Sequence, residues 1–430
     1  MSREPHTYYE SALPPAAARP PLAVAEAADV CVIGGGLAGL ASALALAERG
    51  RRVVLLEARH IGWGASGRNG GFVSAGFALG GEAILKRLGA GPGRELYDLS
   101  HAAVERVRER ASRDLGAGDG KVPMGSGILV GWRYDPGAGV EAEVAAHAQL
   151  LGEDLEFWPK ARLRQALATE RYHCAVFNRR GFHLNPLAFC RRMARLAELA
   201  GVRIHEASPV AAVERQGQGW TVRSGSGAVA AREVVLAGGG YLGRLVAGVA
   251  QGILPICTYV MTTEPLGARL AAAIACDHAI GDTRMNCDYY RPLADGRLLW
   301  GGDITVRQQP PRRLAEQMRA RMVAVYPQLA DARIDFAWQG TMSYARHRMP
   351  AIGEAAPGLW YATGFGGHGM ATTTLAGELI GGALAEGDTR YRLLAPFGLP
   401  WAGGVLGQIA AQTVYWWHAA NEARRERRAG

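Results

Sequence analysis

A glycine-rich turn between a strand pattern and a helix pattern constrains this chain more than any other feature. Residues 28–33 (ADVCVI) form a short apolar run that is typical of a buried parallel strand. The glycine turn 34–39 (GGGLAG) comes next, residues 37–49 have helical periodicity, and the apolar run 53–56 predicts a second strand. This order predicts a β-α-β unit with a right-handed crossover.

The spacing of the glycines and of one acid predicts a dinucleotide site. Gly34 permits a tight turn, Gly36 lets the backbone approach a pyrophosphate, and Gly39 lets the helix pack on the sheet. The helix N-terminus then faces the phosphates. Glu57 ends the second strand, 18 residues after Gly39, where a carboxylate can bind a ribose 2′-hydroxyl. A free 2′-hydroxyl argues against NADP and leaves NAD and FAD.

A second glycine-rich segment follows the acid. Residues 62–71 read GWGASGRNGG. Glycines let a backbone wrap closely around a long planar cofactor. Trp63 is unusual in a flexible surface loop, which favours a binding role for this segment.

Taken together, these motifs resemble the D-amino-acid-oxidase-type flavoprotein superfamily, and within it the γ-glutamylputrescine oxidase group. Further segments share the resemblance, which extends from about Tyr8 to Trp401: VVLAGGG at 234–240, YYR at 289–291, DGRLLWGG at 295–302, WYATGFGGHGM at 360–370 and FGLP at 397–400.

The pattern of strands and helices predicts an α/β fold in two parts. We expect a Rossmann-like FAD-binding domain with an inserted α+β substrate domain, which is built on a mainly antiparallel sheet. The predicted FAD-binding domain is discontinuous and comprises residues 1–90, 165–250 and 335–430. Residues 91–164 and 251–334 form the predicted substrate domain.

The resemblance implies a set of FAD-binding residues. Those expected at the ADP half are Gly34, Gly36, Gly39, Glu57 and Ala58, with Val210 on the adenine side. Those expected along the pyrophosphate and the isoalloxazine are Ala65, Ser66, Arg68, Asn69, Gly70, Gly71 and Gly238. Those expected to close over the flavin are Gly364, Phe365, Gly366, Gly367, Gly369 and Met370. Covalent relatives use a cysteine before this last loop; residues 338–353 contain none, so we expect non-covalent FAD.

The implied reaction is hydride transfer from the substrate carbon to FAD, which gives an imine that hydrolyses to an aldehyde or ketone. A site that keeps the amine neutral by desolvation suffices, and no strong acid or base is required. The candidate catalytic residues are His368, Tyr290 and His347, and the candidate pocket residues are Phe72, Tyr290 and Met342. For each polar candidate the alternative is an ordinary hydrogen-bonded residue. No metal site is expected.

Two positions bear on the substrate. Relatives that oxidise α-amino acids hold the carboxylate with basic side chains. Met342 stands where the resemblance places an arginine, and Ala371 stands where sarcosine-oxidising relatives have a lysine. We therefore expect a small amine without an adjacent carboxylate, although Arg291 or Arg346 could reach the site.

Three questions stay open at this point. The electron acceptor is oxygen or, for a flavin dehydrogenase, a quinone or another acceptor, since no lysine follows Lys160 to activate oxygen. A non-catalytic FAD-binding module is the alternative from another class. Residues 405–428 predict a helix that docks on the protein or lies on a membrane, and we favour docking because Gln408, Gln412 and His418 interrupt the apolar stripe.

Composition limits the remaining classes. The net charge of +9 is spread along 430 residues without an aromatic-interleaved basic stretch, so no nucleic-acid partner is expected. The six cysteines form no C-x-x-C pair, which fits a reducing compartment. The N-terminal residues lack a signal-peptide pattern and no run of 18 apolar residues occurs, so a cytoplasmic location is expected.

Overall fold

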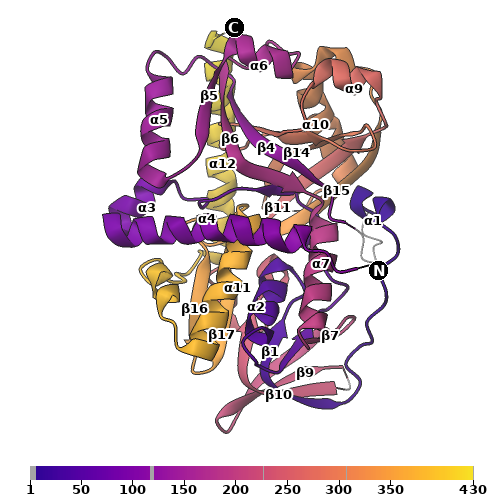
Figure 1. Ribbon diagram of the computed structural model, residues 1–430, viewed down its shortest axis with the longest axis vertical. Coiled ribbons are helices and arrows are strands. Elements are labelled where there is room, and N and C mark those ends of the chain that lie inside the picture. Colours follow the sequence, from indigo (N-terminus) through magenta and orange to yellow (C-terminus); the bar gives the residue numbers. More distant parts are fainter. Residues whose placement is uncertain (1–5, 117–120, 226, 307, 430) are drawn as a thin grey trace.

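Two β-sheets organise the protein into two lobes (Figure 1). The computed structural model describes residues 6–116, 121–225, 227–306 and 308–429. The first sheet has the strand order β16-β17-β10-β1-β2-β7, and β9 pairs with β10 and carries β8. Its strands are β1 (Ala25–Ile33), β2 (Val53–Leu56), β7 (Arg203–His205), β8 (Val210–Gln216), β9 (Gly219–Ser224), β10 (Gly227–Leu236), β16 (Ala351–Ala356) and β17 (Leu359–Thr363).

The centre of the first sheet is parallel and buried. β1 pairs in parallel with both β2 and β10, and β10 pairs in parallel with β17. All four residues of β2 are buried, as expected for a strand covered on both faces. The sequence prediction of a Rossmann-like β-α-β unit is confirmed.

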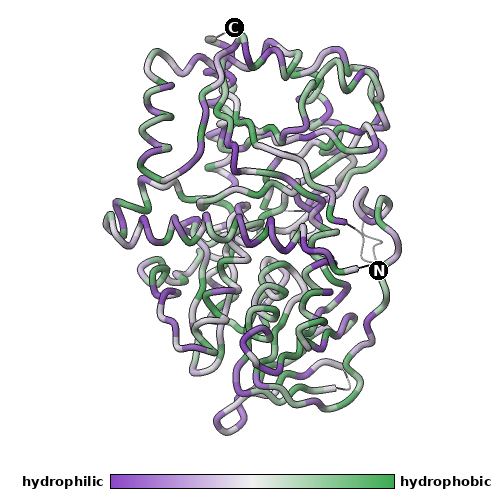
Figure 2. Tube along the Cα trace, viewed as in Figure 1, coloured by the Kyte–Doolittle hydropathy of each residue, from purple (hydrophilic) through white to green (hydrophobic). Residues whose placement is uncertain are grey.

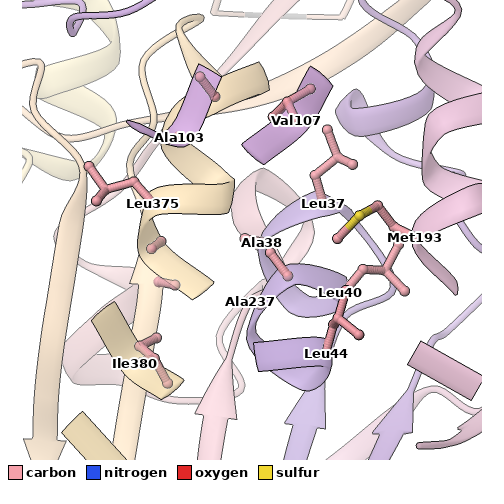
Figure 3. Packing of buried hydrophobic residues seen from close by; sticks show 14 of the residues in the cluster. Leu37, Ala38, Leu40, Leu44, Ala103, Val107, Met193, Ala237, Leu375 and Ile380 are labelled. Carbon is pink, nitrogen blue, oxygen red and sulfur yellow. The ribbon is translucent and has the colours of Figure 1, made fainter. Parts of the chain in front are cut away.

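Helices α2 (Leu37–Ala47) and α11 (Gly369–Glu386) pack against each other over this sheet. Figure 3 shows Leu37, Leu40 and Leu44 of α2 beside the other apolar side chains of this core. A Cβ atom on Gly377 would lie 2.4 Å from the backbone carbonyl carbon of Ala41, so the absence of a side chain permits the close approach. α4 (Ala90–Ser112) and α7 (Pro186–Leu199) complete the layer.

The second sheet is mainly antiparallel, as predicted for the substrate domain. Its order is β15-β11-β14-β13-β12-β4-β6-β3, with β5 paired to β6, and of the strand pairs described in this second sheet β4·β12 alone is parallel. The strands are β3 (Phe72–Val73), β4 (Met124–Trp132), β5 (Leu155–Pro159), β6 (Cys174–Leu184), β11 (Leu254–Thr263), β12 (Ala279–Asp282), β13 (Tyr289–Pro292), β14 (Leu298–Thr305) and β15 (Ile334–Tyr344).

The remaining helices surround these sheets. They are α1 (Tyr8–Ala12), α3 (Gly81–Leu88), α5 (Val140–Leu151), α6 (Lys160–Ala166), α8 (Ala247–Ala250), α9 (Ala268–Ala273), α10 (Pro311–Val325) and α12 (Gly404–Ala429). Figure 2 shows hydrophobic residues inside both lobes and hydrophilic ones along much of α4, which crosses between the lobes. Within the described residues, no helix has the length and apolarity that a membrane crossing requires.

Sheet membership differs from the predicted domain boundaries at three strands. β3, β6 and β15 all belong to the second sheet, although the predicted boundaries placed all their residues except Ile334 in the FAD-binding part. These strands join the second sheet by pairing: β6 with β4, β15 with β11, and β3 with β6.

The Pro/Ala-rich composition of residues 1–27 predicts an arm that wraps the surface, but the described part of this arm is not purely a surface segment. Thr7 and Glu10 form a capping box that begins α1. Tyr9 is fully buried, and its hydroxyl donates to the carbonyl of Asn69 at 2.8 Å. The part of the arm that the structure describes therefore helps to hold the 62–71 loop.

Candidate cofactor and substrate site

A cavity of about 840 Å³ contains residues from both sheets. Its volume lies within the range of about 300–1,000 Å³ that is usual for ligand sites. The lining comes largely from residues within the segments 33–38, 56–59, 63–66, 69–72, 208–210, 237–242, 341–344 and 365–371. Segments far apart in the sequence thus meet at one site.

The glycine turn shapes one end of the cavity. Gly34 has φ +113°, and a Cβ on Gly39 would lie 1.9 Å from the Gly34 carbonyl oxygen, so both positions require glycine. The backbone N–H of Leu37 donates to Ser66 Oγ at 2.9 Å. A Cβ on Gly36 would lie 2.9 Å from the same Oγ, so its absence leaves this wall open. The N-terminus of α2 therefore faces the cavity, where it can hold a phosphate.

Glu57 lies beside this turn and holds it in place. Its two carboxylate oxygens accept the backbone N–H groups of Gly35 at 2.6 Å and of Arg59 at 2.8 Å. Burial raises the pKa of Glu57, and the two N–H donors oppose that shift. Each carboxylate oxygen has a further lone pair, which can accept a ribose hydroxyl.

Asn69 fixes the 62–71 loop from within. Its side-chain amide donates to the carbonyls of Ala65 and Ser66, and its oxygen accepts the N–H of Gly71 at 2.7 Å. These bonds enclose the short 3-10 helix Ala65–Gly67. The loop is consequently ordered by its own sequence, as a binding segment must be.

Arg68 supports the same loop from behind. Its guanidinium donates to the carbonyl of Trp63 at 2.7 Å and stacks over the Trp63 ring. Its own carbonyl accepts the indole N–H of Trp338 in β15 at 2.8 Å. Arg68 thus joins the loop to the second sheet.

The opposite end of the cavity lies under the 364–370 loop and the N-terminus of α11. Ser343 holds this loop, because its Oγ accepts the N–H of Gly364 and its carbonyl accepts the N–H of Gly366, each at 3.0 Å. Gly369, Met370 and Ala371, the first residues of α11, line the cavity. The positive end of this helix dipole favours negative charge at that place.

Most of the predicted cofactor residues line the cavity. These are Gly34, Gly36, Glu57, Ala58, Ala65, Ser66, Asn69, Gly70, Gly71, Val210, Gly238, Phe365, Gly366, Gly367, Gly369 and Met370. Gly39, Arg68 and Gly364 are absent from the lining and support it by the contacts described above or by backbone shape.

His368 lines the cavity but is held by protein groups. Its Nε2 lies 3.1 Å from the carbonyl oxygen of Ala75 and 3.3 Å from Ser74 Oγ. Burial lowers the pKa of His368, so its neutral form predominates at pH 7. The contact with Ala75 requires a proton on Nε2, which makes His368 a clamp between α11 and the 74–75 segment.

The structure places Tyr290 and His347 outside the cavity. Tyr290 is fully buried, stacks on Trp300 at 4.3 Å, and shares hydroxyl hydrogen bonds with Tyr172 and Tyr326. Successive residues of a strand point to opposite faces, so in β13 the neighbouring Tyr289 takes the cavity side.

His347 lies beside the tail of the chain. Its Nε2 is 3.1 Å from the Gly398 carbonyl oxygen, and its Nδ1 accepts the N–H of Met349. Both ring nitrogens of His347 are engaged in local contacts, so His347 has a structural role.

Two of the predicted pocket residues, Phe72 and Met342, line the substrate end of the cavity. Tyr289 and Tyr344 also line it and were not predicted from the sequence. The apolar wall continues through Ile128, Val130 and Ile304. Strand alternation could have indicated Tyr289, because Gly301 faces its ring closely across β13 and β14. No sequence signal pointed to Ile128 and Val130, which the fold brings from a distant strand.

Charged side chains are scarce along the described lining. Arg59 is the one cation there, and it lies at the Glu57 end. Asp282 lines the substrate end, but its oxygens pair with Arg133 and Arg284 at 3.1 and 2.7 Å. The described lining therefore offers no cation beside Met342.

The two arginines that could have reached the site lie elsewhere. Arg291 is buried and donates to the carbonyls of Gly70 and Leu184, so it braces the loop from outside. Arg346 is exposed and is absent from the lining.

This arrangement fits a dinucleotide-type flavin. One helix N-terminus and Glu57 stand at one end, a glycine loop runs along the middle, and a second helix N-terminus closes the other end. The comparisons agree. The sequence profile of the family described as "DAO: FAD dependent oxidoreductase" matches residues 29–382, so the chain belongs to this family.

Individual relatives show which oxidoreductases the chain is similar to. The chain is 32% identical over 400 residues to "Probable oxidoreductase OrdL" of Haemophilus influenzae, covering 91% of each protein. It is 34% identical over 369 residues to "Gamma-glutamylputrescine oxidoreductase" of Escherichia coli, covering 85% of this chain and 86% of that protein. The crystal structure of glycine oxidase from Geobacillus kaustophilus matches with a TM-score of 0.70 and 23% identity, covering 87% of this chain and 99% of that one. The protein is an FAD-dependent oxidoreductase related to amine and amino-acid oxidases.

Proposed function

We propose that the protein oxidises the C–N bond of a small amine that carries no carboxylate next to that bond. The supporting observation is the substrate end of the cavity, where Met342 and Ala371 occupy the lining and no described cation faces them. A carboxylate buried there without a partner would cost several kcal/mol. An uncharged amine meets no such penalty.

The chain contributes binding, orientation and the exclusion of water. The apolar wall of Phe72, Ile304 and Met342 disfavours an ammonium ion, so the substrate nitrogen binds neutral with its lone pair available. Burial raises the pKa of Tyr344 in the cavity lining further above its usual value, so this phenol is uncharged at neutral pH. The α11 N-terminus and the loop held by Ser343 favour negative charge at the cofactor.

FAD, when bound, supplies the acceptor for a hydride from the substrate carbon. As that C–H bond breaks, the nitrogen lone pair forms the C=N bond of an iminium ion, which releases its N–H proton to water. The imine then takes up water to give a carbonyl compound and ammonia or an amine. Oxygen or another acceptor would be the co-substrate that takes up the two electrons.

Substrate profiling tests the proposal. We expect γ-glutamylputrescine or another alkylamine to bleach the flavin anaerobically, with kcat/KM at least tenfold, or about 1.4 kcal/mol, above those of glycine, sarcosine and D-proline. Met342→Arg should shift this preference toward α-amino acids, whereas the matched control Met342→Leu should not. An α-amino acid at least tenfold better with the natural protein contradicts the proposal.

The same experiment separates the acceptors. Hydrogen peroxide release identifies an oxidase, and reduction of a dye or quinone without peroxide identifies a dehydrogenase. Stable FAD binding without bleaching by any amine or amino acid would instead favour the non-catalytic module.

We also propose that FAD is held without a covalent bond. Cys287 lines the cavity, but burial, with Asp282 and Asp288 nearby, raises the pKa of its thiol to about 12, so little reactive thiolate is present at neutral pH. Acid precipitation should release all yellow colour to the supernatant. Colour in the pellet that disappears in Cys287→Ser would show a covalent link.

A further inference from the structure

The C-terminal helix α12 has its polar face against the protein and its apolar face toward solvent. This is the reverse of an ordinary amphipathic surface helix. Its inward contacts are Gln412 with the N–H of Val306 at 3.0 Å, the Tyr415 hydroxyl with that of Tyr344, Glu422 with the N–H of Met285 at 2.7 Å, and Glu426 with Arg171 and Arg284.

The outward face is apolar over several turns. Val405, Leu406, Ile409, Trp416 and Trp417 are 55–73% exposed. At 3.6 residues per turn, positions 406 and 417 lie on one side of the helix. Positions 405, 409 and 416 lie along the adjoining flank, next to Gln412. Trp401, 61% exposed, precedes this stripe. Exposed large hydrophobic side chains in such an arrangement mark an interaction surface.

Positive charge continues the same face. Arg424 and Arg427 are exposed and follow Trp417 and Ala420 by seven residues each, which is nearly two full turns. The whole chain carries a net charge of +9. The stripe and its basic end therefore form a surface whose charge complements an anionic partner.

We propose that this outward face of α12 binds the surface of an anionic lipid bilayer. Tryptophan rings suit the level of the lipid headgroups, and aliphatic side chains reach the acyl boundary below them. Arginine side chains at the end of the stripe pair with lipid phosphates. Because the polar face already has partners in the protein, α12 lies on the bilayer without leaving its docked position.

A second copy of the chain fits this face less well. A helix of 26 residues is about 39 Å long and about 10 Å wide, so a helix pair would bury only about 400 Å² on each partner. Stable protein interfaces bury about 800 Å² on each partner. A lipid surface needs no such area or shape match.

The helix is also connected to the cavity. Tyr344 and Met285 both line it, and they are direct partners of Tyr415 and Glu422 on the inner face of α12. Figure 1 shows α12 running along the second lobe to the C-terminus. Membrane binding would thus place one wall of the cavity directly behind the lipid-facing helix.

Vesicle co-sedimentation of the full-length, FAD-loaded protein tests the inference. We expect binding to vesicles of about three parts phosphatidylcholine to one part phosphatidylglycerol, weaker binding to pure phosphatidylcholine, and a loss at high salt. Replacing both Trp416→Ser and Trp417→Ser should weaken vesicle binding at least tenfold. Arg424→Gln with Arg427→Gln should remove the preference for the anionic vesicles.

Matched controls come from exposed apolar residues elsewhere. Val24→Ser and Leu199→Ser alter side chains that are 63% and 57% exposed, and they should leave vesicle binding unchanged. Flavin absorbance and thermal unfolding should be the same in every variant. Three outcomes overturn the inference: natural protein that stays in the supernatant, equal losses in the control variants, or a dimer in sedimentation equilibrium that the tryptophan variants dissociate.

Discussion

At the residue scale, Glu57 has two tasks that one carboxylate can combine. It accepts the N–H groups of Gly35 and Arg59, which shapes the glycine turn, and it lines the cavity where a ribose would lie. We expect Glu57→Ala to weaken FAD binding by about 1–3 kcal/mol, because a charged hydrogen bond is lost and two N–H donors lose their partner. Fluorescence titration of the apoprotein with FAD measures this change.

Glu214→Ala provides the control for that titration. Glu214 is an exposed carboxylate of the same sheet, paired with Arg223, and its removal should leave the Kd for FAD unaltered. An unchanged Kd in Glu57→Ala as well would mean that Glu57 is not a ribose ligand.

Individual residues were predicted well where a motif fixes the backbone. They were predicted poorly where the alternation of a strand decides which side chain faces the cavity. The glycines and Glu57 follow from spacing, and they line or support the cavity. Tyr290 was predicted to line the pocket and Tyr289 was not, although both belong to the same YYR motif, and one residue of register exchanges core and cavity. Tyr344 belongs to no motif that predicts its position. That position depends on the pairing of β15 with β11.

At the scale of elements, the close packing of α11 on α2 fixes the positions of the N-termini of these two helices at the cavity. A Cβ at residue 377 would meet the Ala41 backbone, so we expect Gly377→Ala to cost about 1–3 kcal/mol of unfolding free energy and to weaken FAD binding. Denaturant unfolding and the FAD titration measure the two effects.

Gly382→Ala is the matched variant on the same helix. Its Cβ would approach only the side chain of Asp388, at 3.1 Å, and alanine favours a helix. It should therefore cost less than Gly377→Ala. An equal loss of unfolding free energy in the two variants would show that the contact between α11 and α2 at Gly377 is not especially tight.

Strand β6 contains a histidine that makes stability depend on pH. Burial lowers the pKa of His183 to about 4, and its Nε2 lies 2.6 Å from the Asp277 carbonyl oxygen. In the unfolded chain His183 takes up a proton near pH 6.5, whereas in the folded chain it does so only near pH 4. The free energy of unfolding is therefore highest above pH 6.5 and declines as the pH falls toward 4. At pH 5 the expected loss is about 2 kcal/mol.

Urea unfolding at about pH 7.5 and pH 5 tests this, with His183→Gln as the comparison because the amide retains a donor and does not titrate. The variant should lose about 2 kcal/mol less between these pH values. Identical losses in both proteins would exclude a titrating role for His183.

Among elements, the sequence predicted those with clear periodicity. The periodicity of residues 94–115 and 140–152 predicts two helices, which appear as α4 and α5. The turn at Asp295-Gly296 predicts a hairpin over residues 286–303, which appears as β13 and β14. β6 was missed because Asn178, Arg179 and Arg180 break its apolar alternation. In α12, Gln412 interrupts the apolar stripe because it belongs to the face that docks on the protein.

At the scale of the whole molecule, the cavity draws its lining from both sheets, so FAD should stabilise both lobes together. At free FAD about 100-fold above its Kd, the expected gain is about 2.7 kcal/mol. Calorimetry of apoprotein and FAD-loaded protein should show one shared upward shift of Tm. FMN lacks the adenosine half that Glu57 would hold, and should shift the Tm less. Two separate transitions, of which FAD moves only one, would contradict this coupling.

The alternation of the chain between the two sheets also has a consequence for its synthesis. The first sheet takes strands from residues 25–56, 203–236 and 351–363, and the second lacks β15 until residue 344 has been made. The glycine turn leaves the ribosome early, but β17 and α11, which complete its surroundings, leave much later. Neither sheet can therefore be complete before residue 344 has been made, and unpaired strand edges would remain available to chaperones until that point.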